Sequence, residues 1–322
     1  MHKELLSAAL AAALTLSLAG CGSGEGADDS FDGYTVGICE QMEHVSLSEA
    51  TRGFKDALVE AFGEDGVRFS EGNALGEQNS CATIIDGFIA EGVDLILANA
   101  TWPLQAAASA TSEIPVLGTS VTDYATALDL GEFDGVIGTN VSGTSDLVPL
   151  EDQAALIKEL FPEAGTVGLL YCSGEPNSVY QVETVRAELE GMGYACEAYA
   201  FTDANDLGAV AQTACDGSDL IYIPTDNTVA ANTETVANVV IPAGVPVVGG
   251  DPGICSGCGV ATITCDYYEL GRLTGELAAE ILRGETDVSA LPVQYLEPLK
   301  VYNAENCAAL GVEIPEGYTP LG

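Results

Sequence analysis

The sequence predicts an α/β protein built from two Rossmann-like parallel-sheet domains that are joined by a multi-crossing hinge. Short runs rich in β-branched residues alternate with amphipathic stretches of helical length, which is typical of a parallel sheet covered by helices. This alternation runs through the first half of the chain and then starts again in the second half. With 322 residues, the chain is long enough for two domains of ordinary size and an ample core.

The first half contains regularly spaced strand and helix patterns. Ser48 is the predicted N-cap of the first helix, because a serine side chain can accept a hydrogen bond from the first helical turn. The predicted strands are residues 34–39, 67–71, 93–98 and 116–119, and the predicted helices are residues 48–62, 77–91 and 104–111.

The second half repeats the same order after a short apolar stretch at residues 136–138. Its predicted strands are residues 166–171, 195–201, 220–223 and 245–248. Its predicted helices are residues 151–161, 178–192, 207–215, 229–241 and 267–283.

The polar, Gly-terminated segment 139–143 lies between apolar strands and is predicted to be the first crossing between the domains. The Pro-rich tail after Leu291 is expected to cross back. We therefore expect an N-lobe of residues 34–140 plus 264–290 and a C-lobe of residues 141–263 plus 291–322. Several crossings between two lobes imply a hinge.

The N-terminus has the pattern of a lipoprotein signal peptide. Residues 5–19 are apolar or small, too few to span a bilayer comfortably, and small residues precede Cys21. A non-cleaved membrane helix is the alternative interpretation. The sequence thus predicts a signal peptide at residues 1–20, lipidation at Cys21 and a flexible Gly-rich linker at 21–33. The protein is expected at the cell membrane, anchored by lipid on the extracytoplasmic face.

The charge balance is strongly acidic, with 49 Asp and Glu residues against 9 Lys and Arg residues and a formal net charge of −40. Nucleic-acid binding needs a cationic surface, so this class of partner is excluded. Direct binding to anionic lipid is also disfavoured. An acidic surface serves solubility in most proteins, so the charge alone identifies no ligand.

Nine of the 10 cysteines remain if Cys21 carries the lipid, and an odd number leaves at least one unpaired within the chain. Cys255 and Cys258 are separated by two residues, but a four-ligand zinc site normally needs a second close pair. We expect loop-stapling or inert cysteines, no metal and no cofactor.

Catalytic motifs are missing from the sequence. There is no G-x-S-x-G motif, and the two histidines are His2, in the predicted signal peptide, and His44. Paired carboxylates for glycoside chemistry stay open because acidic residues are frequent. The sequence therefore favours a binding protein over an enzyme.

Seven segments occur in the order found in one family: residues 72–78, 100–107, 120–123, 143–149, 175–178, 224–228 and 266–271. Between about residues 34 and 296, the sequence resembles the tryptophan/tyrosine-type ABC transporter substrate-binding proteins. The resemblance implies the type I periplasmic-binding fold and a monomeric uptake receptor. Such a receptor delivers a small solute to an ABC permease and its ATPase, and several members bind aromatic amino acids.

One position departs from the family pattern. Trp102 stands where the family normally has a small residue. Its ring could stack on the ligand, or it could pack on the outer lip of the cleft, since tryptophan is amphipathic.

Ligand-binding groups are expected on the loops at the carboxyl ends of the strands, facing the cleft between the lobes. Thr101, Ser120 and Thr122 offer hydroxyl and backbone N–H groups for a carboxylate. An ammonium needs acceptors, and the candidates are Asp226, Asp251 and Glu43, with Asp226 preferred. An N-cap role is the alternative for Asp226, and a turn-closing role is the alternative for Asp123. Further candidates are Trp102, Asn177, Ser178 and Asn227, with helix capping as the alternative for Asn177 and Ser178.

Two alternatives keep the fold and change the role. The ligand could be a nucleoside or a sugar, because type I folds bind these as well and a fold does not determine its ligand. The receptor could also present its ligand to a sensor kinase. No Lys or Arg lies on a predicted cleft loop, which disfavours anionic ligands and leaves neutral solutes and zwitterions.

Overall fold

The computed structural model describes residues 31–321, of which residues 33–321 belong to one compact unit. The predicted signal peptide at 1–20, the lipidation site Cys21 and most of the linker at 21–33 lie outside the described residues. Within the described part of the chain, no helix has the length and apolar character needed to cross a membrane.

The first lobe is built on a parallel sheet with strand order β11-β5-β4-β3-β1-β2. Both faces are covered, as expected for a parallel sheet. Val36 and Ile38 pack with α2 and α12 on one face, whereas Cys39 packs with α3 and α4 on the other. The strands are β1 (Tyr34–Glu40), β2 (Val67–Asn73), β3 (Leu95–Asn99), β4 (Val116–Val121), β5 (Val141–Ser145) and β11 (Gln294–Tyr295). The helices are α2 (Val45–Phe62), α3 (Gln78–Glu91), α4 (Thr101–Ala110), α5 (Tyr124–Leu128) and α12 (Tyr267–Leu282).

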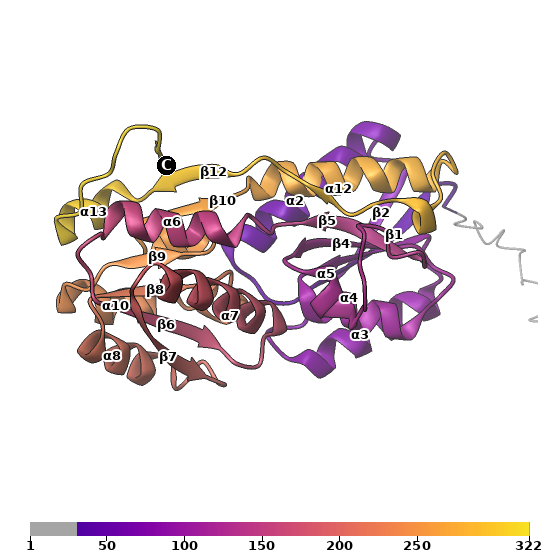
Figure 1. Cartoon of the computed structure of the whole chain (residues 1–322). Helices are drawn as coiled ribbons and strands as arrows, with labels where there is room; N and C mark the ends of the chain where they lie inside the picture. Colours follow the sequence, from indigo (N-terminus) through magenta and orange to yellow (C-terminus); the bar gives the residue numbers. More distant parts are fainter. Residues whose placement is uncertain (1–30, 322) are drawn as a thin grey trace, which may run out of the picture. The chain divides into compact units, whose positions relative to one another are not determined.

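The second lobe has the strand order β13-β12-β10-β9-β8-β6-β7, parallel except where β12 pairs with β10. Helices α6, α7 and α13 cover one face, and α8, α10 and α11 cover the other (Figure 1). The strands are β6 (Thr166–Cys172), β7 (Ala195–Phe201), β8 (Leu220–Ile223), β9 (Val247–Gly249), β10 (Ala261–Thr264), β12 (Leu299–Tyr302) and β13 (Thr319–Pro320). The helices are α6 (Leu150–Leu160), α7 (Pro176–Gly191), α8 (Leu207–Gly217), α9 (Asn227–Ala230), α10 (Thr233–Ala243), α11 (Pro252–Gly257) and α13 (Ala304–Leu310), with a short 3-10 turn at Val288–Ala290. The predicted fold class, two Rossmann-like parallel-sheet domains, is confirmed.

The chain passes between the sheets after β5, after β10 and after β11. The prediction that residues 139–143 form the first crossing is wrong, because Val141–Ser145 is a buried strand paired with β4. Its polar side chains are satisfied inside the lobe: the Ser142 hydroxyl donates to the Leu291 carbonyl, and the Thr144 and Thr274 hydroxyls lie 2.8 Å apart. The first crossing therefore starts at Asp146. Strands β5 and β11 belong to the first sheet, whereas the prediction placed them in the C-lobe, within residues 141–263 and 291–322.

Several local predictions also need correction. Helix α2 begins at Val45 with His44 as the N-cap, so Ser48 lies inside the helix. The predicted helix 229–241 is divided into α9 and α10, and residues 136–138 contribute only a bridge between Val136 and Pro292.

Helices α2 and α12 come from opposite ends of the chain and run side by side (Figure 1). A Cβ atom added at Gly53 would meet the Tyr268 carbonyl oxygen, and one added at Gly271 would meet the Ala50 carbonyl oxygen. The two backbones therefore approach each other more closely than larger residues would allow.

The nine cysteines from Cys39 to Cys307 are free thiols, and all except Cys196 are buried. The Cys39 and Cys81 side chains lie in the same buried cluster of the first core. Among residues 31–321, no three His, Cys, Asp or Glu side chains gather in a way that could hold a metal ion.

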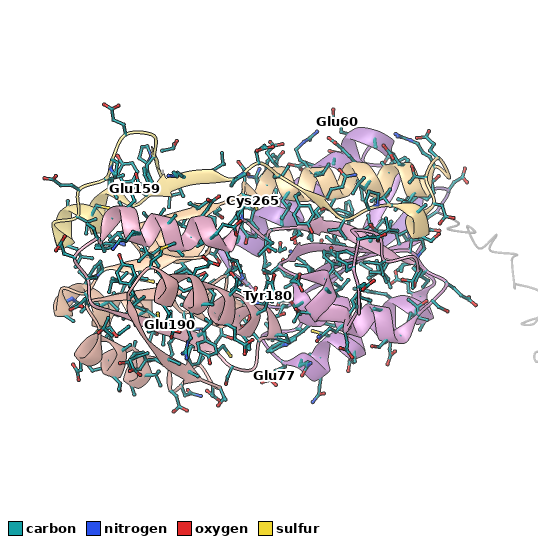
Figure 2. All side chains as sticks on the ribbon, viewed as in Figure 1. Glu60, Glu77, Glu159, Tyr180, Glu190 and Cys265 are labelled. Carbon is teal, nitrogen blue, oxygen red and sulfur yellow. The ribbon has the colours of Figure 1, made fainter. Side chains whose placement is uncertain are left out.

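The acidic residues are spread over the surface. The labelled side chains of Glu60, Glu77, Glu159 and Glu190 lie on separate parts of the surface in Figure 2, and all four are exposed. Such a distribution fits a general solubilising role for the negative charge.

Candidate functional site

Buried polar side chains collect on the loops that follow the carboxyl ends of the strands in both lobes. In a protein interior, such groups are nearly always hydrogen-bonded, so unpartnered ones indicate a functional site. Among the described residues, the unpartnered atoms on these loops are Gln41 Nε2, His44 Nδ1, Ser46 Oγ, Ser120 Oγ, Asp146 Oδ1, Asn177 Oδ1 and Asp251 Oδ2.

In the first lobe, the backbone itself is strained at the ends of two adjacent strands. Ala100 follows β3 with φ 92°, and Ser120 near the end of β4 has φ 53°. Non-glycine residues adopt such angles at a cost of about 1–3 kcal/mol, and they concentrate at functional sites. Ala100 is the N-cap of α4 and Ser120 lies near the end of the neighbouring strand β4, so both shape the first-lobe wall of the candidate site.

The predicted first-lobe residues lie on this wall and differ in burial and in hydrogen bonding. Thr101 and Thr122 are buried, and Ser120 keeps its hydroxyl without a partner within the part of the chain described. Trp102 is half-buried, and its backbone N–H donates to Gln41 Oε1 at 3.2 Å. Asp123 accepts a hydrogen bond from the Thr126 N–H and so caps α5, as the alternative interpretation expected.

Glu43, a predicted ammonium acceptor, is exposed on the loop after β1. It therefore lacks the burial of the other acidic candidates.

The second lobe carries a buried carboxylate that sequence reasoning missed. Glu175 is 0% exposed and accepts hydrogen bonds from Asn227 N at 3.0 Å and Asn227 Nδ2 at 2.7 Å. It also accepts from Thr228 N at 2.8 Å and Thr228 Oγ1 at 2.7 Å. Glu175 thereby fixes the start of α9, and its own position follows from the turn before α7.

Asp226 is 0% exposed and uses both carboxylate oxygens within its own lobe. Oδ1 accepts from Val229 N at 2.9 Å, as an N-cap of α9, and Oδ2 accepts from Cys172 N at 2.7 Å. Burial and the neighbouring Glu175 carboxylate raise the pKa of Asp226 to about 8. Asn177 and Ser178 lie close by, and their side chains donate to the Thr225 carbonyl.

Asp251 is also a buried N-cap, but only one of its oxygens is occupied. Oδ1 accepts from Ile254 N at 2.7 Å, and Oδ2 has no partner among the residues described. Burial raises the pKa of Asp251 to about 7, with further contributions from Asp146 and Glu175. These electrostatic interactions place Asp251 near the hinge crossing at Asp146.

Asp146 begins the first crossing and is the second residue that sequence reasoning missed. Its Oδ2 accepts from the Tyr267 hydroxyl at 2.7 Å, whereas Oδ1 has no partner in the described part of the chain. Burial raises the pKa of Asp146, and the hydrogen bond from Tyr267 opposes this effect. The sequence did contain a signal, because Asp146 lies in segment 143–149, which carries the family resemblance. The crossing was predicted at residues 139–143, however, so Asp146 was not recognised as a residue of the crossing.

No lysine or arginine of residues 31–321 forms an ion pair with Asp146, Asp226 or Asp251. Isolated charges are costly to bury, so these carboxyl groups either hold protons or meet a cation from outside the chain. This acidic cluster is the main electrostatic feature of the site.

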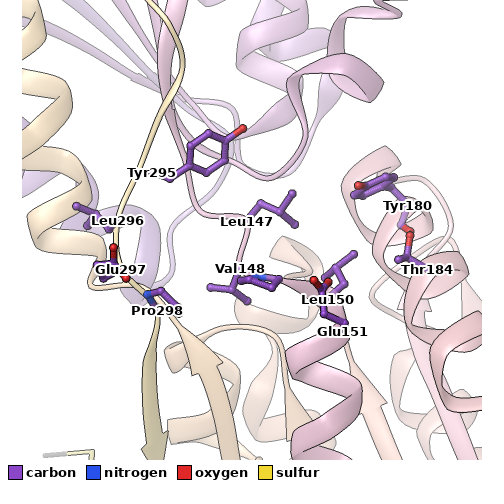
Figure 3. Close-up of a pocket in the computed structure, with 11 residues that line it drawn as sticks. Leu147, Val148, Leu150, Glu151, Tyr180, Thr184, Tyr295, Leu296, Glu297 and Pro298 are labelled. Carbon is purple, nitrogen blue, oxygen red and sulfur yellow. The ribbon is translucent and has the colours of Figure 1, made fainter. Parts of the chain in front are cut away.

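A cavity of about 530 Å³ lies beside the crossings, as Figure 3 shows. It is lined by the crossing segments 147–151 and 295–298 together with Tyr180 and Thr184 of α7. Because it contains none of the unpartnered polar atoms, size alone does not make it the better candidate.

The chain matches the family model described as ABC transporter substrate binding protein over residues 35–319. It therefore belongs to the ABC transporter substrate-binding protein family, and its fold is that of the type I periplasmic-binding proteins. The family consists of solute-binding proteins that act with a permease and an ATPase.

Two kinds of relative illustrate the match. The tyrosine-binding protein of Clostridioides difficile (strain R20291) is 30% identical over 97% of this chain and 93% of its own length. The structure of an ABC domain in complex with L-Trp from Streptococcus pneumonia is 31% identical, covering 88% of this chain and 96% of that chain, with a TM-score of 0.84.

A third relative is a ligand-free, open structure of a substrate-binding protein with adhesive properties from Clostridium difficile. It is also 31% identical, covering 89% of this chain and 99% of that chain, but its TM-score is 0.68. At equal identity, the present structure thus resembles the L-Trp complex as a whole more than it resembles the open protein.

Proposed function

We propose that this protein is the lipid-anchored, extracytoplasmic receptor of an ABC importer and that it binds a zwitterionic amino acid, preferably an aromatic one. The observation that carries the proposal is the pair of unpartnered carboxylate oxygens, Asp146 Oδ1 and Asp251 Oδ2, in a buried site without a pairing cation from residues 31–321. A ligand ammonium supplies the missing charge and the missing hydrogen-bond donors.

Asp146 and Asp251 replace Asp226 as our ammonium acceptors. Both oxygens of Asp226 already accept backbone N–H groups, so an ammonium would have to compete with the cap of α9. Asp251 has one oxygen on its cap and one oxygen available.

The first lobe offers the complementary groups for the ligand carboxylate. Ser120 Oγ and Gln41 Nε2 are buried donors without partners in the described chain, and Thr101 lies buried at the start of α4. Hydroxyl, amide and backbone donors suit a carboxylate. Each lobe would thus bind one charged end of the ligand.

Support for an aromatic side chain comes from the relatives, one named for tyrosine and one solved with L-Trp. The half-buried ring of Trp102 offers an aromatic surface beside Gln41. The lipid anchor rests on Cys21 and the residues before it.

Calorimetry with L-tyrosine and L-tryptophan tests the proposal. Truncating one partner of a desolvated charge pair costs about 2–5 kcal/mol, so Asp251→Asn should weaken binding by at least roughly 25-fold. The fold should persist, because Asn caps a helix nearly as well as Asp. Indole-3-propionate, which lacks the ammonium, should bind the wild type weakly and should lose little affinity in the variant.

Asp266→Asn is the matched control, because Asp266 caps α12 by accepting from the N–H three residues further on, as Asp251 does for α11, but is exposed. It should leave the affinity unchanged. Wild-type affinity in Asp251→Asn, with binding of L-tyrosine or L-tryptophan by the wild type established, would remove Asp251 from the ammonium site.

A further inference from the structure

A single hydrogen bond joins two buried side chains from different lobes. His44 follows β1 of the first sheet, and Asn227 follows β8 of the second sheet. Their atoms His44 Nε2 and Asn227 Oδ1 lie 3.1 Å apart, and the residues are only 8% and 6% exposed. We propose that His44 and Asn227 form a latch that holds the closed lobes together around the ligand.

The second-lobe side of the latch is fixed before the lobes meet. Asn227 Nδ2 donates to Glu175 Oε2 at 2.7 Å, which orients the amide and leaves its oxygen facing His44. The backbone N–H of Asn227 bonds to the same carboxylate oxygen at 3.0 Å. Because Glu175, Asn227 and Thr228 belong to one lobe, this arrangement does not depend on closure.

The amide orientation assigns the histidine tautomer. Asn227 Oδ1 can only accept, so His44 Nε2 must carry the proton and Nδ1 is the unprotonated nitrogen. Burial lowers the pKa of His44 to about 4, which keeps the ring neutral near pH 7. A neutral ring with one donor aimed at one acceptor is a directional contact without a buried charge.

The first-lobe side is equally well defined. The His44 backbone caps α2, and its carbonyl accepts the Ser48 N–H at 3.0 Å. Beside it, Gly253 of α11 lies against the start of α2, where an added Cβ would be 3.3 Å from Ser46 Oγ. The latch therefore lies at a close contact between the lobes, where small displacements would break the hydrogen bond.

The latch rests on the proposed amino-acid binding, because closure is coupled to a ligand only if one binds. An interaction made only in the closed state slows ligand release without changing the first encounter. The net stabilisation by one hydrogen bond between uncharged groups corresponds to a change of about fivefold in a rate or equilibrium constant. We expect L-tyrosine to dissociate about fivefold faster from His44→Ala, with an unchanged association rate.

Stopped-flow fluorescence of Trp102, the only tryptophan in the sequence, measures these rates in the full chain. His44→Gln restores a donor amide and should return the dissociation rate to within about twofold of wild type. Ser48→Ala, on the exposed side of the first turn of α2, is the control and should change neither rate. The melting temperature without ligand should stay the same in all three variants, which separates a latch from a structural role.

The double variant His44→Ala with Asn227→Ala completes the test. If the two side chains act on each other, its dissociation rate should equal that of the more affected single variant instead of the product of both effects. Multiplying effects, or a wild-type dissociation rate in His44→Ala, would overturn the latch and leave the proposed function standing. If the wild type binds neither L-tyrosine nor L-tryptophan, the proposed function fails, and the latch fails with it.

Discussion

The loops after β8 and β9 place two aspartates in equivalent positions, and the two differ in one respect. Asp226 and Asp251 both follow a central strand of the second sheet, both cap a short helix and both are buried. Asp226 has both oxygens bonded to backbone N–H groups. Asp251 has one oxygen bonded, and the other has no partner among residues 31–321.

This difference separates a structural carboxylate, Asp226, from Asp251, the carboxylate that we propose binds the ligand. The cap of α9 reaches back to Cys172 at the end of β6, so Asp226 ties together two strand ends and a helix start. The cap of α11 makes no such second connection. Burial and helix capping are thus shared by both residues, and only the count of satisfied oxygens distinguishes their roles.

Among the tests of the difference between Asp226 and Asp251, the largest effect is expected on the free energy of unfolding. Asp226→Ala removes the acceptor of two buried N–H groups and should lower the free energy of unfolding by about 2–4 kcal/mol. Asp251→Ala removes one cap bond and a carboxylate without a partner cation, so its loss should be roughly 1 kcal/mol or less. Urea unfolding without ligand measures both values, and equal losses would break the distinction.

A smaller change in stability is expected when the pH is varied. Burial raises the pKa of Asp226 to about 8 and that of Asp251 to about 7. The folded, ligand-free protein therefore binds these protons more tightly than the unfolded chain, and stability should rise as the pH falls from 8.5 to 6.5. Below pH 6.5 the effect of His44 has the opposite sign, because its pKa is lowered to about 4 and protonation favours the unfolded chain.

Thermal melts at several pH values between 8.5 and 6.5 measure this slope. Asp226→Asn and Asp251→Asn should each flatten it, since each removes one titrating group. A melting temperature that falls steadily across this window in the wild type would contradict the assigned pKa directions.

The smallest effect should be that of Asp226→Asn on ligand affinity, a change of less than about threefold, because Asn retains one acceptor oxygen for the cap. Calorimetry with L-tyrosine compares it with Asp251→Asn. A loss of roughly 25-fold in Asp226→Asn would return the ammonium to Asp226.

Much of the fold could be predicted because the buried strands are continuously apolar. Residues 220–223, a fully buried strand, were predicted with the bounds that the structure has, and the long helix α12 differs by one residue. The bounds of residues 195–201, a mostly exposed edge strand, were also predicted correctly. Strand β5 was missed for the opposite reason. Its sequence Val-Ser-Gly-Thr-Ser reads as a loop, and only the partners Leu291 and Thr274, far along the chain, make its burial possible.

The sequence predicted which loops form the candidate site, but it did not predict the role of each residue on those loops. Asp251 and Asp226 look alike in sequence, since each precedes a short helix, and their difference arises from the approach of Cys172. Asp146 and Glu175 lay within segments that carried the family resemblance, yet nothing local marked them as buried. Asn227 was predicted as a ligand contact, and the structure shows its side chain bonded to Glu175 and His44.

The pairing of α2 with α12 determines when the first lobe can be completed during synthesis. Helix α12 and strand β11 follow every central strand of the second sheet in the chain. A nascent chain that ends before Tyr267 already contains the β6 to β10 core of the second lobe, but it leaves Ala50, Phe54 and Ala57 of α2 uncovered. Domains generally fold in the order in which they emerge from the ribosome. Here the lobe that is begun first must wait, with an apolar helix face in water, until nearly the whole polypeptide has been made.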